Sequence, residues 1–197
     1  MSHILHSLRP SNPFGISASN DQQITNIPST LMRAEKIYLI GFMAAGKSSL
    51  ARALAERLKW HVEDIDDRIE VREHKTISEL FSQRGESYFR MVERAILTEM
   101  LPLNHTVIAT GGGTFVDPDN QAAINGNGAS IWIDVPLAQI ISRLSPDKRR
   151  PLASTRAQLE QLYALRQSAY AQAHLRLDGS GAPIGELADR VVDWLGS

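Results

Sequence analysis

The sequence predicts an α/β fold: a mainly parallel, five-stranded sheet with helices on both faces. Two observations carry this prediction. Short apolar runs alternate along the chain with segments of helical periodicity, and glycine or proline follows closely after four of the runs. Because strands separated by helices pair in parallel, and parallel sheets are covered on both faces, this order of elements favours a layered α/β domain.

The predicted elements follow one another in a regular order. The strands are Ile37–Ile40, Trp60–Ile65 (the weakest candidate), Thr106–Ala109, Ala129–Val135 and Leu175–Leu177. The helices are Ser48–Lys59, Glu86–Leu101, Ser154–Ala171 and Ile184–Leu195, and Thr76–Glu79 has the spacing of a capping box.

Residues 1–33 differ in composition from the rest of the chain. They are rich in serine and proline and show no sustained apolar periodicity. A segment of this kind cannot bury enough surface to offset the entropy of ordering, so we expect a mobile N-terminal extension. Residues 34–197 are then the folded domain.

Composition excludes several classes of protein. The chain has no cysteine, which rules out disulfide scaffolds, thiolate zinc sites and cysteine nucleophiles and fits a reducing cytoplasm. No apolar run approaches the roughly 20 residues that span a bilayer. With 21 basic and 22 acidic residues the net charge is −1, which argues against a nucleic-acid partner.

The segment Gly41–Ser48 reads Gly-Phe-Met-Ala-Ala-Gly-Lys-Ser, which matches the spacing G-x-x-x-x-G-K-[ST] of a P-loop. It lies between a predicted strand and a predicted helix, where backbone N–H groups and a helix N-terminus bind phosphate. Lys47 is expected to reach the β- and γ-phosphates, and the Ser48 hydroxyl to coordinate Mg²⁺. A chance match occurs on the order of once in several hundred chains, so the segment indicates triphosphate binding.

The P-loop alone does not identify a reaction. No asparagine in the chain is followed by lysine, so the guanine-reading motif of GTPase switches is absent. A small kinase or a nucleotide-dependent binding module remains.

Two carboxylates follow the second predicted strand. Strand alternation directs Asp64 and Asp66 to the same side. One of them can hold the hydration shell of Mg²⁺, and the other can accept a hydrogen bond from an acceptor hydroxyl. The alternative is a solvated acidic turn, since Asp67 and Glu70 follow.

Arg90 and the three glycines Gly111–Gly113 are candidates for acceptor binding. A helical arginine can bind a carboxylate with two nitrogens, or it can form surface ion pairs, here with Glu86 and Glu93. The glycines end a buried strand at the edge where α/β sheets bind ligands. This position favours a close approach of backbone to ligand over a plain loop.

A basic cluster extends from Arg143 to Arg156. Its bases are Arg143, Lys148, Arg149, Arg150 and Arg156, and prolines at 146 and 151 interrupt any helix. We expect a mobile lid at about residues 145–156 that neutralises charge on the triphosphate and excludes water. A solvated basic loop is the alternative. Arg166, on the next helix, is a second candidate for acceptor binding.

Together these motifs resemble the shikimate kinase family over about residues 37–194. The matching features are the P-loop, Asp64-x-Asp66, Phe89-Arg90, Gly111–Gly113, Arg150-Pro151-Leu152, and Arg166 with Tyr170 four residues later. The resemblance implies a P-loop, nucleoside-monophosphate-kinase-like three-layer fold with strand order 2-3-1-4-5. It also implies Mg²⁺- and ATP-dependent phosphorylation of the 3-hydroxyl of shikimate, on the path to chorismate and the aromatic amino acids, by a monomer.

The resemblance also implies residue roles. Ala44, Ala45, Gly46, Lys47, Ser48 and Ser49 would bind the triphosphate, with Arg143 on adenine and Arg150 on the phosphates. Ser48 and Asp64 would serve the metal. Asp66, Arg90, Gly111, Gly112, Gly113 and Arg166 would bind shikimate, and Lys47, Asp66 and Arg150 would act in catalysis.

The sequence departs from the family at two P-loop positions. Ala44 stands where the family usually has glycine, and Ser49 where it usually has threonine. If position 44 requires a positive φ, alanine adds strain on the order of 1 kcal/mol, which would weaken ATP binding without abolishing the chemistry.

Two alternatives remain from the residues. One is a related small-molecule kinase, such as a gluconate kinase. Arg90 and Arg166 in one pocket would instead indicate an acceptor that carries a carboxylate. The other is a non-catalytic nucleotide-binding relative, which the presence of Lys47, Asp66 and Arg150 disfavours.

Overall fold

The structure, a computed structural model, describes residues 34–144 and 155–197. The expected N-terminal extension and most of the expected lid, including Arg150, lie outside these ranges.

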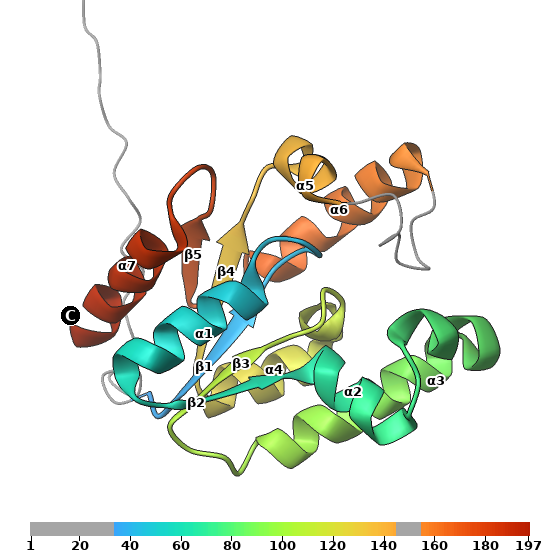
Figure 1. The fold of residues 1–197 in the computed structure, drawn as a ribbon, viewed down its shortest axis with the longest axis horizontal. Helices are drawn as coiled ribbons and strands as arrows, with labels where there is room; N and C mark the ends of the chain where they lie inside the picture. Colours follow the sequence, from blue (N-terminus) through green and yellow to red (C-terminus); the bar gives the residue numbers. More distant parts are fainter. Residues whose placement is uncertain (1–33, 145–154) are drawn as a thin grey trace, which may run out of the picture.

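The described chain alternates strands and helices (Figure 1). The strands are β1 (Lys36–Ile40), β2 (His61–Asp64), β3 (Thr106–Ala109), β4 (Ala129–Asp134) and β5 (Leu175–Asp178). The helices are α1 (Lys47–Leu58), α2 (Ile65–Glu73), α3 (Ile77–Met100), α4 (Pro118–Asn127), α5 (Leu137–Arg143), α6 (Arg156–Tyr170) and α7 (Ile184–Gly196), with a 3₁₀ turn η2 (Thr114–Val116). All five predicted strands are confirmed to within one residue at each end.

The strands form one parallel sheet in the order β2-β3-β1-β4-β5, which confirms the predicted order. β1 is central, and its five residues are all buried. Tyr38 is opposite Ile108 of β3 on one side and Ser130 of β4 on the other. The run Ile37–Ile40 is apolar because β1 has a strand on each edge and helices on both faces.

Helices cover the sheet as two layers. In Figure 1, α1 and α7 lie side by side in front of the sheet and α4 lies behind it. Leu50 and Leu54 of α1, and Leu187 and Val191 of α7, are all buried in the same core. Spacings of three or four residues produce this apolar face. No helix within the described ranges is long and apolar enough to cross a membrane.

Some helices were not predicted. α2 and α4 are short and polar, so they carry little apolar periodicity. α4 does carry a boundary signal: the Asp117 side chain accepts from the N–H groups of Asp119 and Asn120, and Pro118 is the first helical residue. α3 joins two predicted segments across a kink at Gly85 (φ 78°), and its predicted capping box of Thr76 and Glu79 is present.

Candidate active site

The P-loop follows β1 and ends at the N-terminus of α1. Gly41 (φ 140°) and Gly46 (φ 98°) have a positive φ that glycine adopts without strain. A side chain at Gly41 would also come within 2.7 Å of the carbonyl oxygen of Ile133. The loop therefore needs both glycines to bring its backbone N–H groups around the start of α1, where the helix dipole favours an anion.

Ala44 lies at the tip of this loop with φ 57°, in the left-handed region. Position 44 therefore does have a positive φ, and alanine is strained here by about 1 kcal/mol relative to glycine. A guanidinium nitrogen of Arg143, at the end of α5, lies 3.5 Å from the Ala44 carbonyl oxygen. Arg143 therefore borders the phosphate loop.

Lys47 and Ser48 begin α1. The Lys47 ammonium folds back over the loop and donates to the carbonyl oxygens of Gly41 (2.9 Å) and Phe42 (2.8 Å). The Ser48 hydroxyl donates to a carboxylate oxygen of Asp64 at 2.6 Å. The two predicted metal residues are thus in contact, although one comes from the helix after β1 and the other from the end of β2. Ser49 is exposed in the first turn of α1.

Asp64 and Asp66 do not face the same hollow. The strand ends at Asp64, which caps α2 by accepting from the Asp66 N–H at 3.0 Å. Alternation therefore does not extend to Asp66. Asp64 lines a groove with Ser48, whereas Asp66 lines a separate pocket with the candidate acceptor residues.

The Ser48–Asp64 pair fits a magnesium site. Mg²⁺ keeps several waters and takes one or two protein carboxylates together with substrate phosphates. Consistent with this, no group of three His, Asp or Glu residues in the described ranges is placed to hold a metal by itself. Burial raises the pKa of Asp64, with Asp66 and Asp67 acting in the same direction and the Ser48 hydrogen bond opposing them. A nearby cation would favour its charged form.

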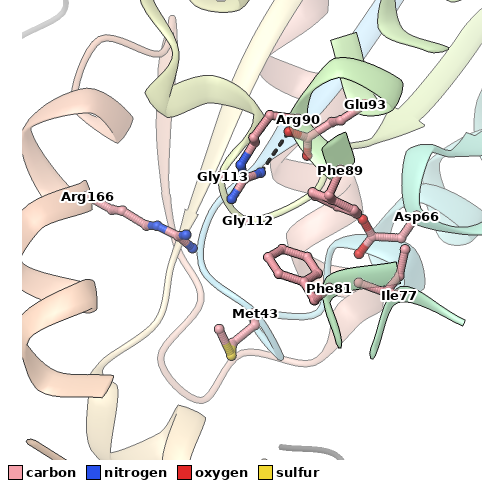
Figure 2. A pocket seen from close by; sticks show the side chains of 11 residues that line it. Met43, Asp66, Ile77, Phe81, Phe89, Arg90, Glu93, Gly112, Gly113 and Arg166 are labelled. Atoms are coloured by element: carbon pink, nitrogen blue, oxygen red, sulfur yellow. Dashed lines mark hydrogen bonds and ion pairs between the residues drawn. The ribbon is translucent and has the colours of Figure 1, made fainter. Parts of the chain in front are cut away.

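The predicted acceptor residues meet in one pocket. It has about 390 Å³ of space including its mouth, and it is lined by Asp66, Arg90, Gly111, Gly112, Gly113 and Arg166. Figure 2 shows Arg166 entering from one side, with Arg90 and Asp66 on the other. Met43, Ile77, Phe81 and Phe89 supply apolar walls. The pocket is small, partly apolar and equipped with two guanidinium groups and a carboxylate.

Arg90 satisfies both interpretations of its sequence position. It donates to the buried Glu93 at 2.7 Å and to the exposed Glu86 at 3.2 Å, and it also lines the pocket. Burial lowers the pKa of Arg90, but Glu93 and Glu86 outweigh that effect and the net pKa is raised. The guanidinium packs on Gly113, where any side chain would collide with it. The ion pairs therefore hold Arg90 at the pocket wall.

Arg166 is bound differently. It is only 6% exposed, and its guanidinium lies over the ring of Phe42 at 5.6 Å. Its terminal nitrogen is 3.1 Å from the position of a side chain on Gly112. Within residues 34–144 and 155–197, no carboxylate forms an ion pair with it, unlike Arg90.

The sequence did not assign site roles to Glu93 or Phe42. Glu93 is 1% exposed and accepts from the Thr114 hydroxyl at 2.7 Å as well as from Arg90. The spacing of three residues between Arg90 and Glu93 identifies Glu93 as an ion-pair partner. The spacing gives no sign that Glu93 is buried. Nothing in the sequence links Phe42 to Arg166, since that contact joins residues far apart in the chain.

Comparison with known proteins matches this arrangement to one family. The family model for shikimate kinase matches residues 43–196. A shikimate kinase of Persephonella marina is 37% identical over 157 residues, which is 79% of this chain and 96% of the relative. One from Thermosynechococcus vestitus is 40% identical over 144 residues, 72% of this chain and 78% of the relative.

Solved structures agree. A shikimate kinase from Acinetobacter baumannii, in complex with shikimate, superposes with a TM-score of 0.78 at 29% identity, covering 84% of this chain and 95% of that one. A deoxyadenosine kinase from M. mycoides, with a TM-score of 0.56 at 16% identity, shares the fold only, over 82% of this chain and 100% of that one. By family match, sequence identity and site residues, the chain belongs to the shikimate kinase family.

Proposed function

We propose that the protein transfers the γ-phosphoryl group of ATP to the 3-hydroxyl of shikimate, giving ADP and shikimate 3-phosphate. The observation that carries the proposal is the buried Arg166, which has no carboxylate partner in the described ranges and faces a pocket beside the P-loop. A buried cation is costly unless an anion compensates it. A carboxylate on the acceptor would supply that charge.

Two guanidinium groups fix the acceptor in this proposal. Arg166 and Arg90 line the same small pocket, and Gly112 lies between Arg166 and the P-loop. Binding one carboxylate from two sides orients the ring of the acceptor. The apolar walls formed by Phe81, Phe89 and Met43 suit the ring carbons.

Asp66 is proposed to act on the hydroxyl that attacks. It lines the acceptor pocket and lies two residues beyond Asp64, which serves the nucleotide side. As the acceptor oxygen bonds to the γ-phosphorus and the bond to the bridging oxygen breaks, the hydroxyl proton passes to the Asp66 carboxylate. Orientation of this hydroxyl is the role that carboxylates serve in related phosphoryl transfers.

The nucleotide side is proposed to follow the general chemistry of P-loop kinases. Lys47 would leave the loop carbonyls and bind the transferred phosphoryl group, while Ser48 and Asp64 would hold Mg²⁺ and its waters. Bound Mg²⁺ neutralises charge on the β- and γ-phosphates. Arg150 keeps its predicted role on the phosphates, although it lies outside the described residues. Arg143 is proposed to lie on adenine. The family membership also supports a monomer located in the cytoplasm.

A coupled assay of ADP release tests the proposal. Shikimate, quinate, gluconate and nucleoside monophosphates are compared as acceptors at equal concentration, with ATP and Mg²⁺. We expect turnover with shikimate to exceed every other acceptor, and removal of Mg²⁺ with a chelator to abolish it. Turnover with gluconate and none with shikimate would contradict the proposal. No ADP release above background with any acceptor would support the non-catalytic alternative.

A further inference from the structure

Tyr170 is the last residue of α6 and does not line the acceptor pocket. Its side chain is 1% exposed, and its hydroxyl donates to the carbonyl oxygen of Gly112. This contact joins residues 58 positions apart. The reaction proposed above uses no atom of Tyr170, so the reason for the contact must lie in what it holds.

The contact holds the middle of the glycine loop. The carbonyls of the outer glycines are used within the loop: Gly111 accepts from the Thr114 N–H at 3.2 Å, and Gly113 from the Val116 N–H at 3.1 Å. The Gly112 carbonyl instead receives the Tyr170 hydroxyl. Because a trans peptide is planar, fixing this carbonyl also fixes the Gly113 N–H on the opposite side.

Both candidate carboxylate-binding arginines rest on this peptide. The guanidinium of Arg166 lies against Gly112, and that of Arg90 lies against Gly113. A rotation of the peptide would therefore move the surfaces on which both guanidinium groups are seated. Glycines offer no side chain to resist such a rotation, and their backbone is otherwise free to adopt many conformations.

Tyr170 and Arg166 are one turn apart on α6, on the same face of the helix. Burial raises the pKa of Tyr170 to about 12, against the charge and hydrogen bond of Arg166. The hydroxyl therefore keeps its proton at neutral pH and acts as a donor to Gly112. One turn of α6 thus places the Arg166 guanidinium at the pocket and the Tyr170 hydroxyl on the glycine loop that forms the pocket wall.

We infer that Tyr170 is a positioning residue for acceptor binding: it fixes the Gly112–Gly113 peptide and so the spacing of Arg90 and Arg166 around the acceptor carboxylate. The inference rests on the proposed function, since it concerns the carboxylate of that acceptor. It assigns no contact with substrate to Tyr170.

Substitution of Tyr170 by phenylalanine tests the inference, because the ring keeps its volume while the donor is lost. We expect the KM for shikimate to rise about 5- to 10-fold, the effect of one net hydrogen bond. The KM for ATP and kcat should stay within about twofold, because the lost hydrogen bond is made to Gly112 and not to a P-loop residue. Hydrogen exchange of residues 110–116, followed by mass spectrometry, should become faster in the unliganded variant.

Tyr38→Phe is the matched control. Tyr38 is also completely buried, and its hydroxyl donates to Asn127 at 2.7 Å. This bond lies away from the pocket, near the amino end of the sheet. Both variants should lose similar thermal stability, but only Tyr170→Phe should change the KM for shikimate or the exchange of residues 110–116.

The outcomes separate the inference from the proposed function. If the wild-type protein does not phosphorylate shikimate, the proposed function fails and the inference fails with it. If the wild type is active but Tyr170→Phe leaves the KM for shikimate unchanged, the inference alone is overturned. Equal rises in the KM for shikimate and for ATP, or the same change in Tyr38→Phe, would also overturn it, since they indicate a general loss of structure.

Discussion

The two ends of the sheet treat buried polar groups in opposite ways. At the amino end, Lys36 is 2% exposed and its ammonium donates to the Leu101 carbonyl and, at 2.6 Å, to Asn127. At the carboxyl end, Arg166 is also buried, at 6% exposed, but it faces a pocket. The Lys36 ammonium donates hydrogen bonds to neutral oxygens of the protein itself. In the proposed function, the Arg166 guanidinium instead binds the carboxylate of the acceptor. The contrast separates structural burial of charge from burial that prepares a binding site.

Backbone strain is distributed in the same way. Lys59 has a positive φ where it caps the end of α1, just before the start of β2, a conformation common at helix C-termini. At the carboxyl end, positive φ occurs in the P-loop at Gly41, Ala44 and Gly46, where it shapes a phosphate site. Similar dihedral angles therefore end a helix at one edge and form a cradle at the other.

The largest expected effect comes from Asp66→Asn. The amide cannot take the proton of the attacking hydroxyl, so kcat should fall about 100- to 10,000-fold. ATP binding, measured by calorimetry, should stay within about twofold because Asp66 lines only the acceptor pocket.

Asp67→Asn is the control for Asp66→Asn. Asp67 is the next residue of α2, is exposed, and lines the nucleotide-side groove and not the acceptor pocket. It should retain near-normal kcat. Unchanged kcat in Asp66→Asn would remove Asp66 from the proposed reaction.

Arg90→Ala should mainly weaken acceptor binding. Loss of one charge-assisted contact predicts a rise in the KM for shikimate of about 10- to 100-fold, with a small change in the KM for ATP. Steady-state kinetics with each substrate varied in turn provide the measurement.

Arg94→Ala is the control on the same helix. One turn beyond Arg90, Arg94 forms ion pairs with Asp117 and Asp119 of the α4 N-terminus, away from the pocket. Surface pairs of this kind contribute about 0–1 kcal/mol to stability. The KM for shikimate should therefore not change. An equal rise in both variants would mean that α3 as a whole, and not Arg90, supports binding.

The contrast between the two ends also explains what the sequence could predict. The strands follow from the apolar runs, since a buried strand needs a continuous apolar segment. Their order in the sheet was predicted only from the resemblance to a family. The P-loop is local and its glycines are visible in the sequence. α2 and α4 escaped prediction because polar, short helices owe their formation to caps such as Asp117 and to packing, not to periodicity.

The sequence motifs identified the residues of the pocket, but they did not identify the side chains that these residues contact. Arg90 and Arg166 are 76 positions apart, and only the tertiary fold brings them together in one pocket. The Arg166 guanidinium lies over the ring of Phe42, and Lys36 donates to Asn127. Both are tertiary contacts that leave no local pattern in the sequence. The expectation that Asp64 and Asp66 point to the same side was wrong for a local reason, because the carboxylate of Asp64 caps a helix that begins at Ile65.

Lys36→Met tests the amino end of the sheet. Burial lowers the pKa of Lys36 from its ordinary value of 10.5. Well below the folded-state pKa, the lysine is charged in both states and folding bears the whole penalty of burying that charge. Between the lowered pKa and 10.5, the unfolded chain binds more protons, so stability rises with pH.

The wild type should therefore gain stability relative to Lys36→Met as the pH rises into the alkaline range, measured by urea unfolding. At neutral pH the two should differ by no more than about 2 kcal/mol. kcat and both KM values should not change, because Lys36 is remote from the pocket. A stability difference independent of pH would show that Lys36 titrates alike in both states.

Ala44→Gly is the smallest expected effect and tests strain at the carboxyl end. Glycine relieves about 1 kcal/mol of left-handed strain, but the greater entropy that it gives the unfolded chain costs about 0.5 kcal/mol. The net gain of about 0.5 kcal/mol corresponds to a rise in Tm of about 1–2 °C. The φ of 57° is present before any nucleotide binds, so the strain is shared by the free and bound protein. The affinity for ATP should therefore change less than about twofold, contrary to what the alanine at this position first suggests.

Lys59→Gly distinguishes strain from ligand binding. Lys59 has φ 58°, close to that of Ala44, but it caps the far end of α1 and is exposed. Both substitutions should raise Tm by similar amounts, and neither should alter the affinity for ATP. An increase of about fivefold in ATP affinity for Ala44→Gly alone, with unchanged Tm, would mean that Ala44 leaves the left-handed region in the free protein and is driven into it by the nucleotide. The strain would then be a property of the ATP complex and not of the fold.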